Sequence, residues 1–265
     1  MNTLLICPVH RSQVSRLSEH HPLVLAPLLG KCLMEYWLEH LASRGDRDVR
    51  IIASDRPDQV RALVGDGSRW GLRVEVMTQS DSTADTPPDH VMIMDHLPGL
   101  AGVPLFESYR TWFKALQTWM PHAGTPARIG RREIKPGISV GMHARISASA
   151  KLHSPCWIGE HCVVSADAII GPGAILEDRA FVGSGACITQ SVIGPETFVG
   201  DFTLVEQSLA SSNLLINWEN RSCLEVPDAF LLSSLRAQPP LKPRTTRLVK
   251  SPMAPLRNLI PGQQS

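Results

Sequence analysis

The fold of this chain is decided by residues 140–188, which read VGMHARISASAKLHSPCWIGEHCVVSADAIIGPGAILEDRAFVGSGACI. A branched aliphatic residue recurs at every sixth position, and a small or compact side chain stands four positions after each one. The aliphatic positions are Val140, Ile146, Leu152, Ile158, Val164, Ile170, Leu176, Val182 and Ile188. The compact positions are Ala144, Ala150, Cys156, Cys162, Ala168, Ala174, Ala180, Ala186 and Val192. A period of six fits neither an amphipathic helix nor an alternating strand, but it fits a coil with three short, flat sides.

The repeat continues beyond Ile188 after a slip of one residue. The later aliphatic and compact positions are Ile193, Val199, Val205, Thr197 and Thr203. Residues 140–210 therefore provide about four coils, which stack at the strand spacing of about 4.8 Å. This pattern resembles the hexapeptide-repeat left-handed β-helix, and the resemblance implies the handedness.

The residue before each aliphatic position is expected to face outward. Five successive repeats hold an apolar residue there: Trp157, Val163, Ile169, Ile175 and Phe181. So much apolar surface is rarely left in contact with water. We therefore expect the N-terminal domain, the C-terminal segment or another subunit to cover at least one face.

The N-terminal part alternates between short apolar strands and helices. We expect strands at 4–7, 49–53, 72–77 and 91–94, and helices at 28–42, 57–64 and 106–117. This alternation favours a parallel, doubly wound sheet, whose ligands bind beyond the carboxyl ends of the strands. The expected fold class is therefore α/β + β, a reduced doubly wound, Rossmann-like domain followed by a parallel β-helix of about four coils.

Three segments of the N-terminal part resemble sugar-1-phosphate nucleotidyltransferases, such as mannose-1-phosphate guanylyltransferase and glucose-1-phosphate thymidylyltransferase. They read PLLGKCLMEY at 27–36, LEHL at 38–41 and GDGSRWG at 65–71. Members of that family often carry a C-terminal hexapeptide-repeat β-helix, and LIN at 215–217 and FLL at 230–232 resemble its endings. The resemblance covers roughly 1–95 and 135–235. It implies attack of a sugar-1-phosphate oxygen on the α-phosphorus of a nucleoside triphosphate, with magnesium as cofactor if the chain is active.

The phosphate-binding signature of that family is degenerate in this chain. The resemblance places its two glycines at Val9 and Arg11, its arginine at Gln13 and its lysine at Leu23. Branched or bulky residues resist the positive φ angles that let glycine approach a phosphate closely. We therefore assign no catalytic residue to this loop, and its cations Arg11 and Arg16 are the candidates for phosphate binding.

Two further features of the family are altered. The element that approaches the base falls at 82–85, where only Thr83 and Ala84 are kept. Asp95 follows the fourth expected strand, and the resemblance makes it the candidate metal ligand; an ordinary carboxylate at the end of a strand is the alternative. Only 96–139 separates it from the first coil, which is too short for the sugar-binding half.

Two histidines on the repeat suggest a different chemistry. His143 and His161 are 18 residues apart, so they are expected to stack on adjacent coils. By resemblance to hexapeptide-repeat acyltransferases, one of them is the candidate general base of a coenzyme A-dependent transfer. Two solvated imidazoles without a catalytic role are the alternative, and no long loop interrupts the coils to build a substrate pocket.

Three hypotheses on function remain open. In the first, the chain is a catalytically degenerate nucleotidyltransferase-like protein that acts as a regulatory or scaffolding subunit in sugar-nucleotide or exopolysaccharide metabolism. Its expected partners are further copies of itself, an active nucleotidyltransferase or a polysaccharide-synthesis enzyme. The second is an active sugar-1-phosphate nucleotidyltransferase with an altered site, and the third is a hexapeptide-repeat acyltransferase.

Composition excludes several classes of protein. With 26 Lys and Arg against 25 Asp and Glu, the net charge is +1, so the cation excess of a nucleic-acid-binding protein is missing. The longest apolar stretch, 23–29, is far shorter than the roughly 20 residues of a membrane span. The first residues lack the basic start and the apolar run of a secretory signal, so export is not expected. Six scattered cysteines favour a reduced, cytoplasmic compartment over a disulfide or zinc framework.

The expected domain organisation has four parts. Residues 1–125 form the truncated nucleotidyltransferase-like domain, 135–212 the β-helix and 213–235 a C-terminal packing segment. Residues 236–265 hold six Lys or Arg, six Pro and no acidic residue, a composition that is expected to stay disordered. A basic docking strip for an acidic partner or a membrane surface is the alternative.

Overall fold

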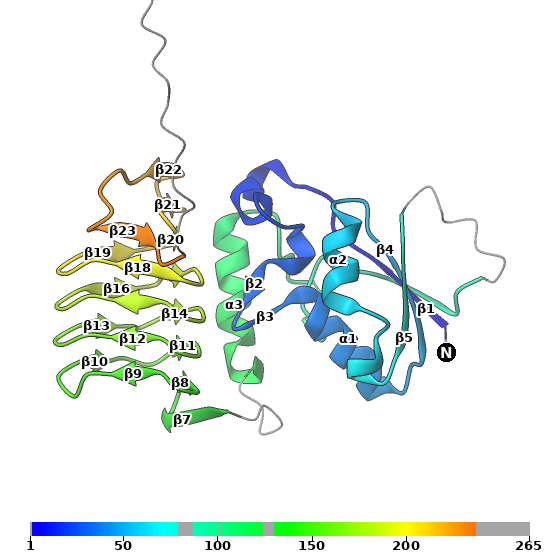
Figure 1. Cartoon of the computed structure of the whole chain (residues 1–265), viewed down its shortest axis with the longest axis horizontal. Helices are drawn as coiled ribbons and strands as arrows, with labels where there is room; N and C mark the ends of the chain where they lie inside the picture. Colours follow the sequence, from blue (N-terminus) through cyan, green and yellow to red (C-terminus); the bar gives the residue numbers. More distant parts are fainter. Residues whose placement is uncertain (1, 79–86, 101, 124–129, 237–265) are drawn as a thin grey trace, which may run out of the picture. The chain divides into compact units, whose positions relative to one another are not determined.

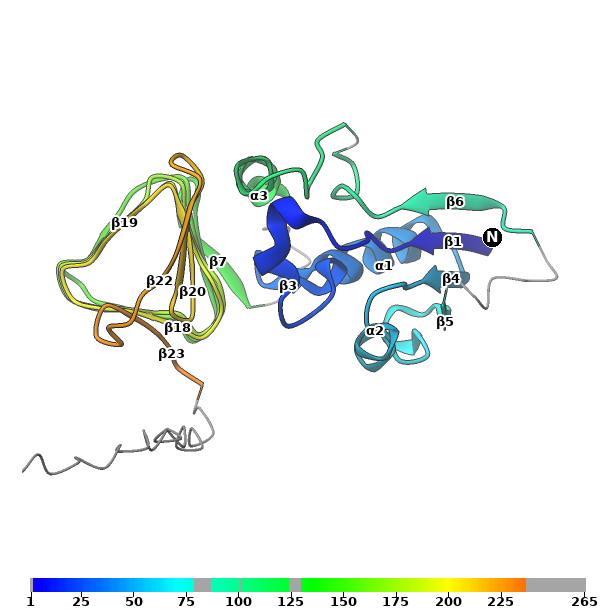
Figure 2. The same ribbon diagram turned by 90° about the horizontal axis from the view of Figure 1, so that it is seen from above.

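The computed structural model describes residues 2–78, 87–100, 102–123 and 130–236. Residues 1–235 pack as one compact unit, and 236–265 form a second unit of which only Arg236 is described. The first unit consists of an α/β region followed along the chain by a three-sided β-helix (Figure 1, Figure 2).

The α/β region is built on a four-stranded parallel sheet in the order β5-β4-β1-β6. Its strands are β1 (Asn2–Ile6), β4 (Asp48–Ile52), β5 (Arg73–Met77) and β6 (His90–Ile93), and β2 (Pro27–Leu28) pairs separately with β3 (Lys31–Cys32). Its helices are α1 (Leu33–Arg44), α2 (Pro57–Val64) and α3 (Tyr109–Ala123), with short 3-10 helices η1 (Ser12–Ser18), η2 (Leu23–Leu25) and η3 (Ser68–Trp70). The four expected strands are confirmed within two residues at each end.

One face of this sheet is buried and the other is partly exposed. Leu5 and Ile51 pair in register and are fully buried in the same apolar cluster as Leu33 of α1. Side chains alternate between faces along a strand, and on the opposite face Val91 and Ile93 are 56% and 54% exposed. The apolar core of the α/β region therefore lies on one side of its sheet.

The helix expected at 28–42 begins later than predicted. Leu28 pairs with Lys31 across a tight turn in which Leu29 and Gly30 have φ angles of 56° and 74°. Two successive residues in the left-handed region cannot continue a right-handed helix, so α1 begins at Leu33. It ends at Gly45, which has a φ of 84° and is the usual residue for that position.

The last helix of the region also begins later than the expected 106–117. Phe106 is buried ahead of the helix, and the Ser108 hydroxyl accepts a hydrogen bond from the Thr111 amide at 3.1 Å. That contact is a side-chain N-cap, so α3 begins at Tyr109.

The β-helix is made of three parallel sheets, which we name side 1, side 2 and side 3. Side 1 contains β8 (Ile138–Gly141), β11 (Cys156–Ile158), β14 (Ala174–Leu176), β17 (Val192–Ile193) and β20 (Ser208–Ser211). Side 2 contains β9 (Arg145–Ile146), β12 (Val163–Val164), β15 (Phe181–Val182) and β18 (Thr197–Val199), and side 3 contains β10 (Lys151–Leu152), β13 (Ile169–Ile170), β16 (Cys187–Thr189) and β19 (Leu204–Glu206). The antiparallel strands β7 (Arg131–Lys135), β21 (Leu214–Asn217) and β22 (Ser222–Glu225) extend side 1, and β23 (Leu232–Ser234) extends side 2. The sequence-based expectation of a three-sided parallel coil is confirmed.

The interior of the coil follows the predicted period. Ile158, Val164, Ile170 and later aliphatic positions form one buried cluster with the small residues four places on. Val192 is the exception, because Ile175 pairs with Val192 and Leu176 with Ile193. Val192 therefore faces outward, and the prediction that it fills a compact inward place is wrong.

Ser191 fills that inward place instead. It is fully buried, and its hydroxyl donates to the Thr189 carbonyl oxygen at 2.7 Å. A satisfied hydroxyl can be buried at little cost, and a serine is small enough for the corner of a coil shortened by one residue.

Side 1 is the covered face of the coil. Trp157 and Ile175 are fully buried, and with Val192 and Leu209 they belong to the apolar cluster of the α/β region. Helix α3 lies along this side (Figure 2). The expectation that the N-terminal part covers outward apolar residues is confirmed for side 1.

Candidate functional sites

The two histidines predicted to stack do so. The rings of His143 and His161 have centroids 4.9 Å apart and planes 20° from parallel. Both residues are exposed and have φ angles of 58° and 56° at the corner where side 1 turns into side 2. An imidazole nitrogen can act as a general base towards a bound nucleophile.

The same corner carries charged residues on the next two coils. Arg179 and Glu196 also have positive φ angles, of 60° and 52°. Their side chains form an ion pair at 3.1 Å. The corner therefore presents two imidazoles and then an ion pair along the stack.

A buried carboxylate joins the β-helix to the turn that precedes α1. Glu177 is 1% exposed, and its two oxygens accept hydrogen bonds from the amides of Leu29 at 2.6 Å and Gly30 at 2.7 Å. Successive residues in the left-handed region aim their amides at one point, which makes a concave anion site. Burial raises the pKa of Glu177 to about 7, and the two amides act in the opposite direction.

Sequence reasoning did not find Glu177, although a signal was present. In other coils of side 1, the residue after the inward aliphatic is a glycine, at Gly141, Gly159 and Gly194. A Cβ at Gly141 or Gly159 would lie 2.7 Å from backbone of the next coil. A glutamate in that column indicates that its side chain points away from the next coil, toward another part of the protein.

The residues at the degenerate signature positions do not form a cluster of charges. Val9, Arg11 and Gln13 are exposed, whereas Leu23 is 1% exposed and packs in the apolar core. Arg16 forms an ion pair with Glu19 at 3.1 Å. A buried aliphatic side chain at position 23 offers no charge to a phosphate.

Asp95 pairs with its neighbour. Its carboxylate lies 2.6 Å from His96 Nδ1. Within the described residues, no group of three or more His, Cys, Asp or Glu side chains could hold a metal ion. The element expected at 82–85 lies outside the described residues.

The buried cysteines are poor nucleophiles. Burial raises the pKa of Cys7, Cys32, Cys156 and Cys162 to about 12. The thiolate is the reactive form of cysteine, so these four side chains act as core residues.

Short parts of the chain match a known family and a known protein. Residues 155–190 match the family model described as bacterial transferase hexapeptide (six repeats). A glucose-1-phosphate thymidylyltransferase of Streptomyces griseus is 43% identical over 56 residues, which are 21% of this chain and 16% of that protein. The match thus spans about a sixth of the length of that relative.

Among solved structures, the chain is similar to a variant of perosamine N-acetyltransferase from Caulobacter crescentus in complex with CoA and GDP-perosamine. The identity is 15%, the match covers 62% of this chain and 92% of that one, and the TM-score is 0.15. In the part of the chain that the structure describes, no helix is long and apolar enough to cross a membrane.

Proposed function

We propose that this protein is a hexapeptide-repeat acyltransferase that moves an acyl group from a coenzyme A thioester to a hydroxyl or amine. The observation that carries the proposal is the pair of exposed imidazoles of His143 and His161, stacked on adjacent coils. The match of 155–190 to a transferase repeat supports it. We assign one of the two histidines as the general base.

The reaction transfers one proton and replaces the sulfur on the acyl carbon by the oxygen or nitrogen of the acceptor. The imidazole accepts the proton of the acceptor hydroxyl or amine, whose oxygen or nitrogen attacks the thioester carbonyl carbon. The carbon–sulfur bond then breaks, and the coenzyme A thiolate leaves and takes up the proton. The stacking of the two rings restricts their rotation, which keeps the base in one orientation.

Release of free thiol from acetyl-coenzyme A tests this proposal, with hexoses, amino sugars and their nucleotide derivatives as acceptors. We expect His143→Ala or His161→Ala to lower kcat about 100-fold or more, as loss of a general base does. His153→Ala is the matched control, because His153 is also an exposed histidine of the β-helix but stands at another corner. Acyl transfer is rejected if the wild type releases no thiol with any of these acceptors. It is also rejected if His143→Ala and His161→Ala release thiol as fast as His153→Ala.

A second candidate is a non-catalytic regulatory or scaffolding subunit for an enzyme of sugar-nucleotide or polysaccharide synthesis. It is supported by position 23, where the resemblance places a phosphate-binding lysine and the chain has a leucine that is 1% exposed in the apolar core. Incubation of the chain with magnesium, nucleoside triphosphates and hexose 1-phosphates should then release no pyrophosphate, and turnover in that assay would instead favour a nucleotidyltransferase with an altered site.

A further inference from the structure

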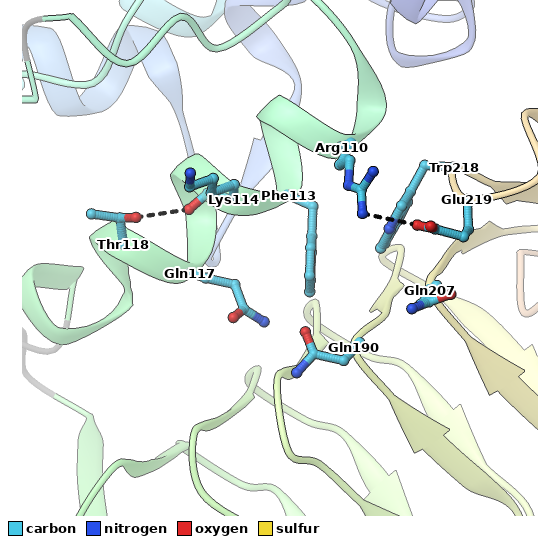
Figure 3. Close-up of a pocket in the computed structure, with 9 residues that line it drawn as sticks. All are labelled: Arg110, Phe113, Lys114, Gln117, Thr118, Gln190, Gln207, Trp218 and Glu219. Carbon is cyan, nitrogen blue, oxygen red and sulfur yellow. Dashed lines mark hydrogen bonds and ion pairs between the residues drawn. The ribbon is translucent and has the colours of Figure 1, made fainter.

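A cleft of about 530 Å³ lies between α3 and the corner where side 3 of the β-helix turns into side 1 (Figure 3). This corner differs from the one that carries His143 and His161. Helix α3, the β-helix corner and the segment after β21 all line the cleft. The tertiary fold therefore assembles it from residues far apart in the sequence.

Three carboxamides line the cleft, Gln117 from α3 and Gln190 and Gln207 from the β-helix corner. Gln190 and Gln207 occupy the same corner on adjacent coils. The equivalent position on the preceding coil is Gly173, where a Cβ would lie 2.6 Å from Gln117 Nε2 and 2.7 Å from Gln190 Nε2. Gln117 uses this room to donate to the Gly173 carbonyl oxygen at 3.0 Å. The missing side chain of Gly173 thus lets two carboxamides lie close together (Figure 3).

These carboxamides keep hydrogen-bonding capacity to spare. Within the described residues, the side chains of Gln190 and Gln207 form no hydrogen bond. A carboxamide has both donor and acceptor atoms, and so does a hydroxyl group. A ligand rich in hydroxyls matches these three side chains.

Cationic and apolar side chains also line the cleft. Arg110 pairs with Glu219 at 3.1 Å, whereas no carboxylate of the described chain lies within ion-pair distance of the exposed Lys114 ammonium. Phe113 and Trp218 stack between them, with centroids 4.6 Å apart and planes at 27°. An ammonium without a partner beside a polar cleft attracts an anion.

We propose that this cleft binds a small, hydroxyl-rich anion, namely a sugar that bears a phosphate or a carboxylate group. Lys114 binds the anionic group, and the amides of Gln117, Gln190 and Gln207 bind the hydroxyls. A volume of about 530 Å³ lies in the range of small-molecule sites. Binding in this cleft does not depend on the acyl transfer proposed above.

Isothermal titration calorimetry of the full chain tests this site, with glucose 6-phosphate, glucuronate, glucose and inorganic phosphate as separate titrants. We expect at least one of the two anionic sugars to bind about tenfold or more tightly than either single-feature titrant. Glucose lacks the charge-assisted hydrogen bond to Lys114, and phosphate lacks the hydroxyls that bind the carboxamides. Lys114→Ala and Gln207→Ala should each weaken this binding about fivefold or more. Lys151→Ala, at an exposed lysine of side 3, is the matched control and should leave it unchanged.

The outcomes distinguish the two anions and can overturn the proposal. Preference for glucose 6-phosphate assigns a phosphate as the anionic group, and preference for glucuronate assigns a carboxylate. The proposal is overturned by lack of binding of both sugars, or by equally tight binding of glucose or phosphate alone. Unchanged affinity in Lys114→Ala and Gln207→Ala, in proteins with the unfolding transition of the wild type, would overturn it as well.

Discussion

Changing Glu177 to Gln removes the charge of the buried carboxylate that accepts hydrogen bonds from the Leu29 and Gly30 amides. Burial raises the pKa of Glu177 from 4.5 to about 7. An acid with a higher pKa in the folded protein contributes stability that is fully present below its unfolded value and is lost as the pH rises through the folded value. The rise from 4.5 to about 7 corresponds to about 3 kcal/mol.

We therefore expect the free energy of unfolding of the wild type, measured relative to Glu177→Gln, to fall by about 3 kcal/mol between pH 4.5 and about pH 8. The two proteins should be nearly equal at the acid end, because a protonated carboxyl and an amide are alike in size and charge. Urea titrations at a series of pH values, followed by tryptophan fluorescence, measure this difference. Glu206→Gln, at an exposed carboxylate of β19, controls for the loss of one negative charge.

Two results would refute this reasoning. A difference between wild type and Glu177→Gln that does not change with pH would mean that the carboxyl does not titrate in the range. A difference that grows in favour of the wild type as the pH rises would mean that the two amides outweigh burial, so that their hydrogen bonds hold the carboxylate ionised throughout.

Three further changes probe other parts of the fold. Gly200→Ala should destabilise the protein by about 1–3 kcal/mol in urea unfolding, because a Cβ there would collide with the Phe230 carbonyl; an unchanged transition would contradict the packing. Arg131→Lys should cost about 1–3 kcal/mol, because the guanidinium lies 3.3 Å from the Trp157 ring centroid and also donates two hydrogen bonds; a loss within error of zero would argue against that contact. Deletion of residues 236–265, a separate unit, should leave the melting temperature unchanged, and a clear fall would show that they pack on the rest.

The β-helix could be predicted closely because its constraint is local and repeated. Each coil pairs with the next in register, so one inward position in six recurs wherever the coil continues. The position of Val192 could not be resolved in this way. Ser191 and Val192 are both compact enough for a corner, and only strand pairing decides which of them faces inward.

The α/β region and its junction with side 1 were harder to predict because their contacts join distant residues. The apolar spacing around Leu28 fits a helix, but the left-handed turn at Leu29 and Gly30 is held by Glu177, 148 residues away from Leu29. The stacked pair of His143 and His161 followed directly from the repeat. The cleft beside α3 did not, because Gln117 and Gln190 meet only after the helix packs on the coil.

The joint between the α/β region and side 1 has a thermodynamic consequence. Trp157, Ile175, Val192 and Leu209, on four successive coils, all enter the core of the α/β region. Unfolding of either region would expose apolar side chains of the other region to water on each of these four coils. We expect scanning calorimetry to record a single heat-absorption peak, with a van't Hoff enthalpy equal to the calorimetric one.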